Sequence, residues 1–413
     1  MEMKKYKLGE IADVIGGVNF EPTDIEPNGI RILRGGNIQN HTISIKEDDV
    51  FLPAQYQDAT NQVQVGDTII VASTGSVEVL GKAATCFDEI PKTQIGAFLR
   101  LLRPKEPQFA MLISIAVNSE HFRKYIRAQA KGTSINNINL GHLKSYEFEA
   151  PAKLESISTF YYNIETKMAL NRAINHNLEA MAKQLYDYWF VQFDFPNEEG
   201  KPYKSSGGAM VWNEELKREI PDGWENGVFS DIANITMGQS PDGSSYNEAG
   251  EGTIFYQGST DFGLRFPSVR MFTTSPSRLA KQGDILMSVR APVGAVNIAN
   301  TDCCIGRGLS AINSKIGSIT YIYYVIHYLK VRFDSLNTAG TTFGSITKDE
   351  LFNLPVVIPS NDVIERFEAI CKPIFEKQME VGFEIESLTK QRDELLPLLM
   401  NGQVSLNYDL SHD

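Results

Sequence analysis

The chain has 413 residues, of which 42% are hydrophobic and 22% are charged, and its formal net charge is −12 at pH 7. This length allows two or three domains, and the composition is ordinary for a globular protein. No run of about 18 apolar residues occurs and the first residues lack a signal-peptide pattern, so we expect a cytoplasmic protein with no membrane span. The four cysteines and six histidines show no metal-ligand spacing, which predicts reduced, buried thiols and no metal site.

Residues 1–150 are predicted to form a first globular, β-rich domain. Short apolar runs such as Ile30–Leu33 and Thr68–Ala72 are bounded by glycine-containing turns, which is typical of short strands. Residues 109–130 carry apolar side chains at helical spacing, which predicts helix near the end of this domain. Basic and acidic residues are nearly equal in number here, so the charge count neither favours nor excludes a nucleic-acid-binding face.

Residues 151–195 are predicted to form a long helix. After Pro151 the chain continues to Val191 without Pro or Gly, and its apolar residues recur in alternating steps of three and four, as in a coiled coil. Asn171 and Asn175 fall on the same stripe, where a buried amide would fix the register of the pairing. Residues 196–223 follow as a polar linker that is rich in Gly and Ser.

The second half repeats this plan, with a β-rich domain at 224–359 and a helical segment at 360–413. Pro373 lies within the helical segment and is expected to kink the helix or delay its start. The two long helices are predicted to pair antiparallel, with the domains related by a pseudo-twofold. The alternative is that each helix packs only on its own domain. The predicted fold class is therefore α+β, with two globular domains separated by two antiparallel coiled-coil helices.

An internal repeat supports this division of the chain. Residues 8–14, 65–71 and 131–138 match 229–235, 282–288 and 340–346 in order, and each second copy lies roughly 210–220 residues after the first. The matched features are turn glycines and apolar strand positions, whereas the loops differ. Two domains of similar fold that carry different loops suggest one protein that recognises two different targets.

Several stretches resemble the specificity subunit of type I restriction–modification systems over essentially the full length. They are Trp189–Asp194, Gly200–Gly208, Glu219–Trp224, Gln257-Gly258, Gln282–Gly294, Cys304–Leu309 and Arg392–Val404. Together, in order and within a repeat of the right length, they are specific. The first half departs from the pattern, because Ser73–Lys82 lacks the Arg-Ala-Pro of residues 290–292.

The resemblance implies two target recognition domains that each read half of a bipartite site on double-stranded DNA. It also implies two modification subunits, which methylate adenine with S-adenosylmethionine, and restriction subunits, which use ATP and Mg, as partners. The chain itself would then be non-catalytic and without cofactor. In agreement, we find no Asn/Asp-Pro-Pro-aromatic tetrapeptide, no complete AdoMet loop and no Walker A lysine.

Candidate DNA contacts are Arg, Lys and small polar residues on predicted loops, since these groups bind phosphates and base edges. Each of these residues could instead have a purely structural role, either as a charged side chain in solvent or as part of a turn or a helix cap. Tyr246, Phe255 and Tyr256 could stack on DNA, although core packing is favoured. The candidates are Arg34, Asn37, Lys82, Lys131, Thr133 and Ser134 in the first domain, and Gln257, Ser259, Arg290, Arg307, Thr341, Thr342 and Lys348 in the second.

Three other functions remain open from the sequence. A self-sufficient DNA-modifying enzyme is disfavoured by the missing motifs. A two-headed interaction scaffold without a DNA role, or a silent specificity variant, would carry the same frame. The DNA target cannot be read from the residues, because base readout depends on loop geometry.

Overall fold

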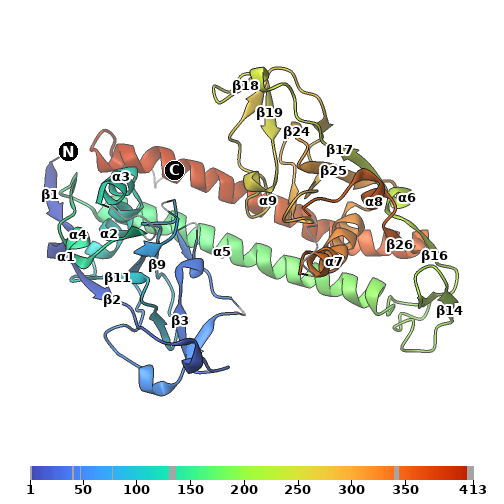
Figure 1. Ribbon diagram of the computed structural model, residues 1–413, viewed down its shortest axis with the longest axis horizontal. Helices are drawn as coiled ribbons and strands as arrows, with labels where there is room; N and C mark the ends of the chain where they lie inside the picture. The colour runs from blue at the N-terminus through green and yellow to red at the C-terminus, as the bar shows by residue number, and fades with distance from the viewer. Residues whose placement is uncertain are drawn as a thin grey trace, which may run out of the picture. The chain divides into compact units, whose positions relative to one another are not determined.

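The computed structural model describes residues 2–39, 41–46, 48–76, 78–129, 136–338 and 344–406. The chain divides into two compact units, the first made of Met1–Leu170 with Ile385–Asp413 and the second of Asn171–Glu384. Each unit contains a globular α+β domain and part of two long helices, α5 (Glu155–Tyr186) and α9 (Asn361–Met400) (Figure 1).

The domain of the first unit is built on two small sheets. The order β2-β11-β7-β9 forms an antiparallel sheet, and β10-β3-β6 forms a mixed sheet in which β3 and β10 are parallel. The helices α2 (Phe109–Asn118) and α3 (Glu120–Gln129) contribute to a core against the first sheet. The strands are β2 (Ala12–Gly16), β3 (Ile30–Leu33), β6 (Val50–Leu52), β7 (Thr68–Val71), β9 (Ala83–Thr85), β10 (Thr93–Ile95) and β11 (Leu99–Pro104).

The domain of the second unit repeats this topology. The order β17-β25-β22-β23 matches the antiparallel sheet, and β19 pairs in parallel with β24 as β3 does with β10. The helix α7 (Ile319–Thr338) stands where α2 and α3 do in the chain order. The strands are β17 (Ala233–Met237), β19 (Thr253–Tyr256), β22 (Ile285–Ser288), β23 (Val296–Ile298), β24 (Cys303–Ile305) and β25 (Leu309–Ser314), with β18 (Tyr246–Asn247), β20 (Phe272–Thr273) and β21 (Leu279–Ala280) extending the second sheet.

The repeat extends to the register of the paired strands and to one close backbone contact between two glycines. Leu99 pairs with Val71 in the first unit as Leu309 pairs with Ser288 in the second. A Cβ on Gly17 would lie 2.1 Å from the Gly96 carbonyl oxygen, and a Cβ on Gly238 would lie 2.1 Å from that of Gly306. Only glycine allows the backbone to approach so closely at these two positions. The internal repeat predicted from the sequence is therefore a structural repeat.

Within each unit the long helices are antiparallel neighbours. In the first unit Glu165 and Met168 of α5 contact Arg392 and Thr389 of α9, so the numbers fall on one helix as they rise on the other. In the second unit Asn171 and Glu179 contact Glu384 and Gln378 in the same sense. The predicted antiparallel pairing is confirmed, and Asn171 and Asn175 are buried as expected of register-fixing residues. The pseudo-twofold between the domains stays a prediction.

The distal helix begins twelve residues before Pro373, so the predicted delay of its start is wrong, and the alternative, a kink, stays a prediction. The helix α9 continues through Pro373 from Asn361 to Met400. Pro373 and Ala369, whose carbonyl loses its helical partner, both lie on the exposed face, where water can bind that oxygen. The neighbouring Cys371 and Phe375 are buried and hold the helix against the core.

The polar stretch 197–208, predicted as part of a linker, is folded against the second unit. Asp194 accepts hydrogen bonds from the Ser205 amide and hydroxyl at 2.7 and 2.6 Å, and Phe195 stacks on Tyr203. A hairpin of β14 (Met210–Asn213) and β15 (Arg218–Pro221) follows. The composition was that of a linker, but the aromatic residues that flank it give the segment a core to pack on.

Candidate nucleic-acid interface

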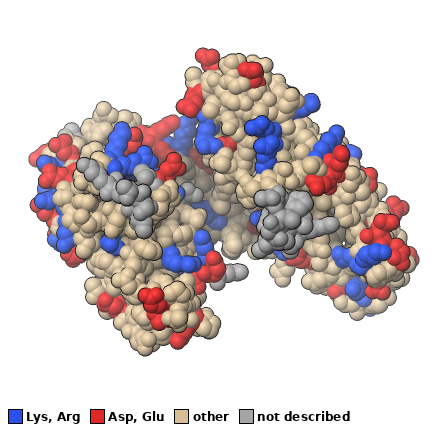
Figure 2. Space-filling model, viewed as in Figure 1, with Lys and Arg blue, Asp and Glu red and all other residues tan. Residues whose placement is uncertain are grey.

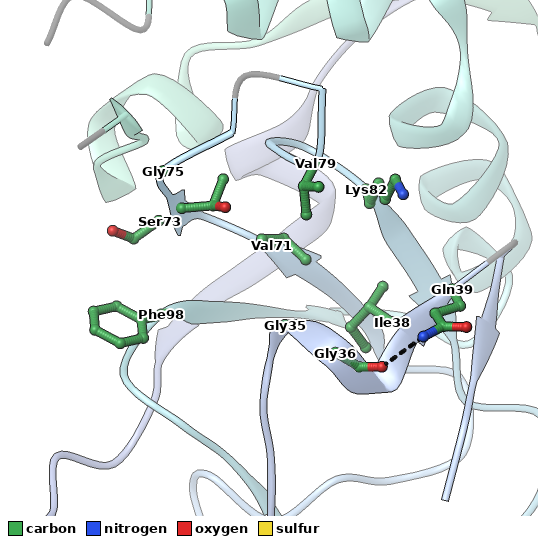
Figure 3. A pocket seen from close by; sticks show the side chains of 11 residues that line it. Gly35, Gly36, Ile38, Gln39, Val71, Ser73, Gly75, Val79, Lys82 and Phe98 are labelled. Atoms are coloured by element: carbon green, nitrogen blue, oxygen red, sulfur yellow. Dashed lines mark hydrogen bonds between the residues drawn. The ribbon is translucent and has the colours of Figure 1, made fainter. Parts of the chain in front are cut away.

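The first unit has a hollow of about 600 Å³ at the ends of its strands (Figure 3). Its wall comes from three turns that follow or precede strands. The turn after β3 supplies Gly35 and Gly36, the segment after β7 supplies Ser73 and Thr74, and Phe98 precedes β11. The other lining residues are Ile38, Gln39, Val71, Gly75, Val79 and Lys82.

The predicted residues Arg34 and Asn37 flank Gly35 and Gly36 in the chain but do not line this hollow, and they differ in exposure. Arg34 is exposed, and its guanidinium donates one hydrogen bond at 3.3 Å to the carbonyl of Asp48. Asn37 is 2% exposed, and its amide donates to the Ser44 carbonyl and to Asp49 while its oxygen accepts from the Arg34 amide. The Asn37 amide is therefore committed to the fold, and the structure gives it no free group for a base edge.

The second unit has a hollow of about 440 Å³ that brings three predicted residues together. Gln257, Arg290 and Arg307 line it with Ser240, Tyr246 and Gly308. The side chains of Gln257, Arg290 and Arg307 are exposed. They come from the turns after β19, β22 and β24, so three segments far apart in the sequence converge. Two guanidinium groups and one amide are the groups that read guanine and adenine edges in duplex DNA.

The two hollows occupy equivalent places in the repeated frame. Arg34 and Gln257 each follow the equivalent strand, and each donates its amide N–H at 2.7 Å to a side chain of the next short turn, Asn37 or Asp261. By the register of the antiparallel sheets, Arg290 corresponds to Ser73. The frame is therefore shared while the lining differs, with two arginines in one hollow and mainly small, amide and apolar groups in the other.

Two other predicted residues in the described part of the chain, Ser259 and Lys348, do not line the hollows. Ser259 begins the short turn Ser259–Asp261 beside the second hollow but does not line it. Lys348 begins α8 (Lys348–Phe352), and its Nζ lies 5.1 Å from the Phe352 ring centroid. Lys131, Thr133, Ser134, Thr341 and Thr342 lie outside the described residues.

Several lining residues were not predicted from the sequence. Phe98 is one of them and is 66% exposed at the rim of the first hollow. Tyr246, which was named as a possible stacking residue, is half-buried and lines the second hollow, whereas Phe255 and Tyr256 are core residues as favoured. Ser73 and Thr74 could have been found by aligning the repeats, because they match the segment that carries Arg290. Figure 2 shows basic and acidic side chains interspersed on the face in view. This agrees with the nearly equal numbers of basic and acidic residues in the first domain.

Metal ions and reactive thiolates each require particular side-chain groups in a protein. The described residues hold no group of three or more His, Cys, Asp or Glu side chains suited to a metal ion. Burial raises the pKa of the Cys86, Cys303 and Cys371 thiols to about 12, so these cysteines are neutral at pH 7. In the same described part, no helix is long and apolar enough to cross a membrane.

Comparisons with known proteins point to one family. The model of the type I restriction modification DNA specificity domain matches residues 221–365. The putative type I restriction enzyme MjaX specificity subunit of Methanocaldococcus jannaschii is 31% identical over 92% of this chain and 85% of its own length. The HindI specificity subunit of Haemophilus influenzae is 23% identical over 98% of this chain and 100% of its own. The S subunit of a type I system from M. genitalium aligns with a TM-score of 0.56 at 16% identity, covers 98% of this chain and 97% of its own, and shares the fold.

Proposed function

The chain belongs to the family of type I restriction–modification specificity subunits, and from this premise we propose that it is the DNA-recognition subunit of such a complex. It is non-catalytic itself and directs a methyltransferase and endonuclease assembly. We assign residues 1–150 and 224–359 as recognition domains, and residues 151–195 and 360–413 as the helical segments that carry them.

The observation that carries the proposal is the pair of equivalent hollows with different linings. A subunit that reads a two-part DNA site needs one frame that presents two sets of side chains, since each half-site has its own pattern of donors and acceptors. In the second hollow Arg290 and Arg307 suit guanine, and Gln257 suits adenine. In the first hollow, Lys82 suits a phosphate or guanine, and Phe98 can stack on or wedge against a base. Arg34 is exposed next to Gly35 in the chain and outside the lining, where it suits a phosphate.

Partners and cofactors follow from the same proposal. Two modification subunits would dock on the helical segments, and restriction subunits would complete the nuclease. S-adenosylmethionine would be bound by the modification subunits and ATP with Mg by the restriction subunits. The chain itself requires none of these groups for reading DNA.

Methylation mapping tests the proposal directly. The chain is expressed with its modification subunit in a methylation-deficient host, and we expect N6-methyladenine at a two-part motif with a fixed gap. The double variant R290A/R307A should relax the sequence of one half only, because each bidentate Arg–guanine contact is worth about 1–3 kcal/mol of discrimination. K201A, which removes an exposed positive charge outside the hollow lining, is the matched control.

The contrary outcomes are equally specific. An assembled complex that methylates nothing and does not bind duplex DNA even at low salt would replace the DNA role by a scaffold role. Methylation at a motif that R290A/R307A leaves unchanged would remove the second hollow as a reading site.

A further inference from the structure

A loop of the second recognition domain inserts a buried cation among three helices. Arg265 is 8% exposed, and its Nη1 lies 3.3 Å from Oε2 of Glu179 on α5. Its guanidinium lies 4.7 Å from the ring centroid of Phe375 on α9 and 5.3 Å from that of Tyr323 on α7. A buried charge is costly unless it is paired, so this loop is tied to the helices at one defined place.

The next residue of the loop packs against the distal helix at a glycine. Phe266 is 5% exposed and stacks on Phe383 with the ring centroids 4.7 Å apart. A Cβ on Gly382 would lie 2.7 Å from the Phe266 ring. Glycine in a helix interior costs about 1 kcal/mol relative to alanine, and here it opens room for an aromatic ring of the recognition domain. Arg265 and Phe266 thus form one contact, the loop anchor, with α5 and α9.

The loop anchor is connected to the second hollow by a few hydrogen bonds. Asp261 accepts the amide N–H of Gln257, a lining residue, at 2.7 Å. The backbone oxygen of Asp261 accepts from the Ser268 amide at 2.7 Å, and its carboxylate accepts from Nε of Arg270 at 2.8 Å. The two ends of segment 261–270 are therefore bonded to each other beside the second hollow, and its middle, Arg265 and Phe266, contacts the helices.

In the first unit a loop residue also lies beside a carboxylate of α5. His41, in the loop that follows the equivalent turn, lies with Nδ1 3.9 Å from Oε1 of Glu165 on α5. Glu165 and Glu179 are fourteen residues apart, which is two heptads, and each is bonded to a polar residue of α9, Arg392 or Gln378. Among the contacts of each recognition domain with the helices there is thus one to a carboxylate of α5.

We infer that Arg265 and Phe266, with Glu179 and Gly382, are positioning residues that set the orientation of the second recognition hollow on the helices. They select the spacing between the two half-sites and leave the base preference within a half-site to the hollow. This inference rests on the proposed function. A loosened anchor lets the hollow take several orientations, so DNA with a wrong spacer becomes less strongly rejected.

Spacer-scanning binding tests the inference. The full chain in complex with its modification subunit is titrated with duplexes that carry the mapped half-sites and a spacer shortened or lengthened by one base pair. For R265A/F266A we expect the preference for the native spacer to fall by about tenfold, the equivalent of about 1.4 kcal/mol. Base preference at both half-sites should stay as in the wild type. R265K keeps the cation and should retain most of the preference.

Two further results separate the possible failures. The buried Trp189 and Trp224 report folding of the second unit, and a variant with altered fluorescence is replaced by F266L, which keeps most of the apolar volume. An unchanged spacer profile in a folded R265A/F266A complex overturns the inference, as does a change in base preference like that of R290A/R307A. Absence of any half-site preference in the wild type refutes the proposed function instead.

Discussion

Removal of the Arg392 guanidinium leaves Glu165 without its closest cationic partner inside the first unit. Their Nη1 and Oε1 atoms are 2.9 Å apart, and the side chains are 9% and 2% exposed. Loss of one member of a buried ion pair costs about 3–5 kcal/mol, because the remaining charge stays desolvated. We therefore expect R392M to destabilise the first unit by about that amount. The double variant E165M/R392M removes both charges and should lie within about 1.5 kcal/mol of the wild type.

The assay must report the first unit specifically. All three tryptophans, Trp189, Trp212 and Trp224, lie in the second unit, so fluorescence would miss the change. Hydrogen exchange of peptides from 155–170 and 385–400 measures the local free energy of opening. K390M is the control, because the Lys390–Glu394 pair on α9 is exposed and should contribute little. Equal loss of protection in R392M and E165M/R392M would refute the reasoning, since the cost would then come from packing and not from charge.

Three further outcomes are expected. G238A should lower the melting temperature of the second unit, followed by tryptophan fluorescence, because its Cβ would meet the Gly306 carbonyl oxygen at 2.1 Å. N37A should reduce hydrogen-exchange protection around the first hollow and leave base preference unaltered, since its amide is buried and internally bonded. Burial lowers the pKa of His327 below its ordinary value of about 6.5, although the negative charge of Glu179 acts in the opposite direction. Between the lowered pKa and about 6.5, the ring is therefore neutral in the folded protein and protonated in the unfolded one. Stability of the second unit should therefore fall as the pH drops below about 6.5 towards the lowered pKa, and H327Q should weaken this dependence in fluorescence-detected melts.

Much of the frame could be predicted because its signals are local. Turn glycines and apolar strand runs recur at a fixed offset, so two copies of one topology followed from the repeat. The alternating steps of three and four gave the long helices. The delayed start expected at Pro373 was wrong because the sequence does not show that this side of α9 faces solvent, where the lost hydrogen bond can be replaced by water.

The candidate site was predictable only in part, because side-chain direction is a property of the fold. Gln257, Arg290 and Arg307 were chosen as loop residues after apolar runs, and the strands carry them to one hollow. Asn37 satisfied the same rule, yet its side chain turns inward to the carboxylate of Asp49. Phe98 was missed since an aromatic residue before a strand usually indicates core packing.

The repeated turn before the last strand of each antiparallel sheet explains how one frame can serve two recognition tasks. Gly96 and Gly306 each accept the amide of the leucine three residues later, and each is approached closely by a glycine of β2's or β17's continuation. The residue that follows is Ala97 in one unit and Arg307 in the other. The glycines are constrained by backbone contact, whereas the residue that follows is half-buried in the first unit, as Ala97, and exposed in the second, as Arg307. Recognition can therefore change at this position without a cost to the fold, and the same separation holds between the buried turn acceptor Asp261 and the exposed Gln257.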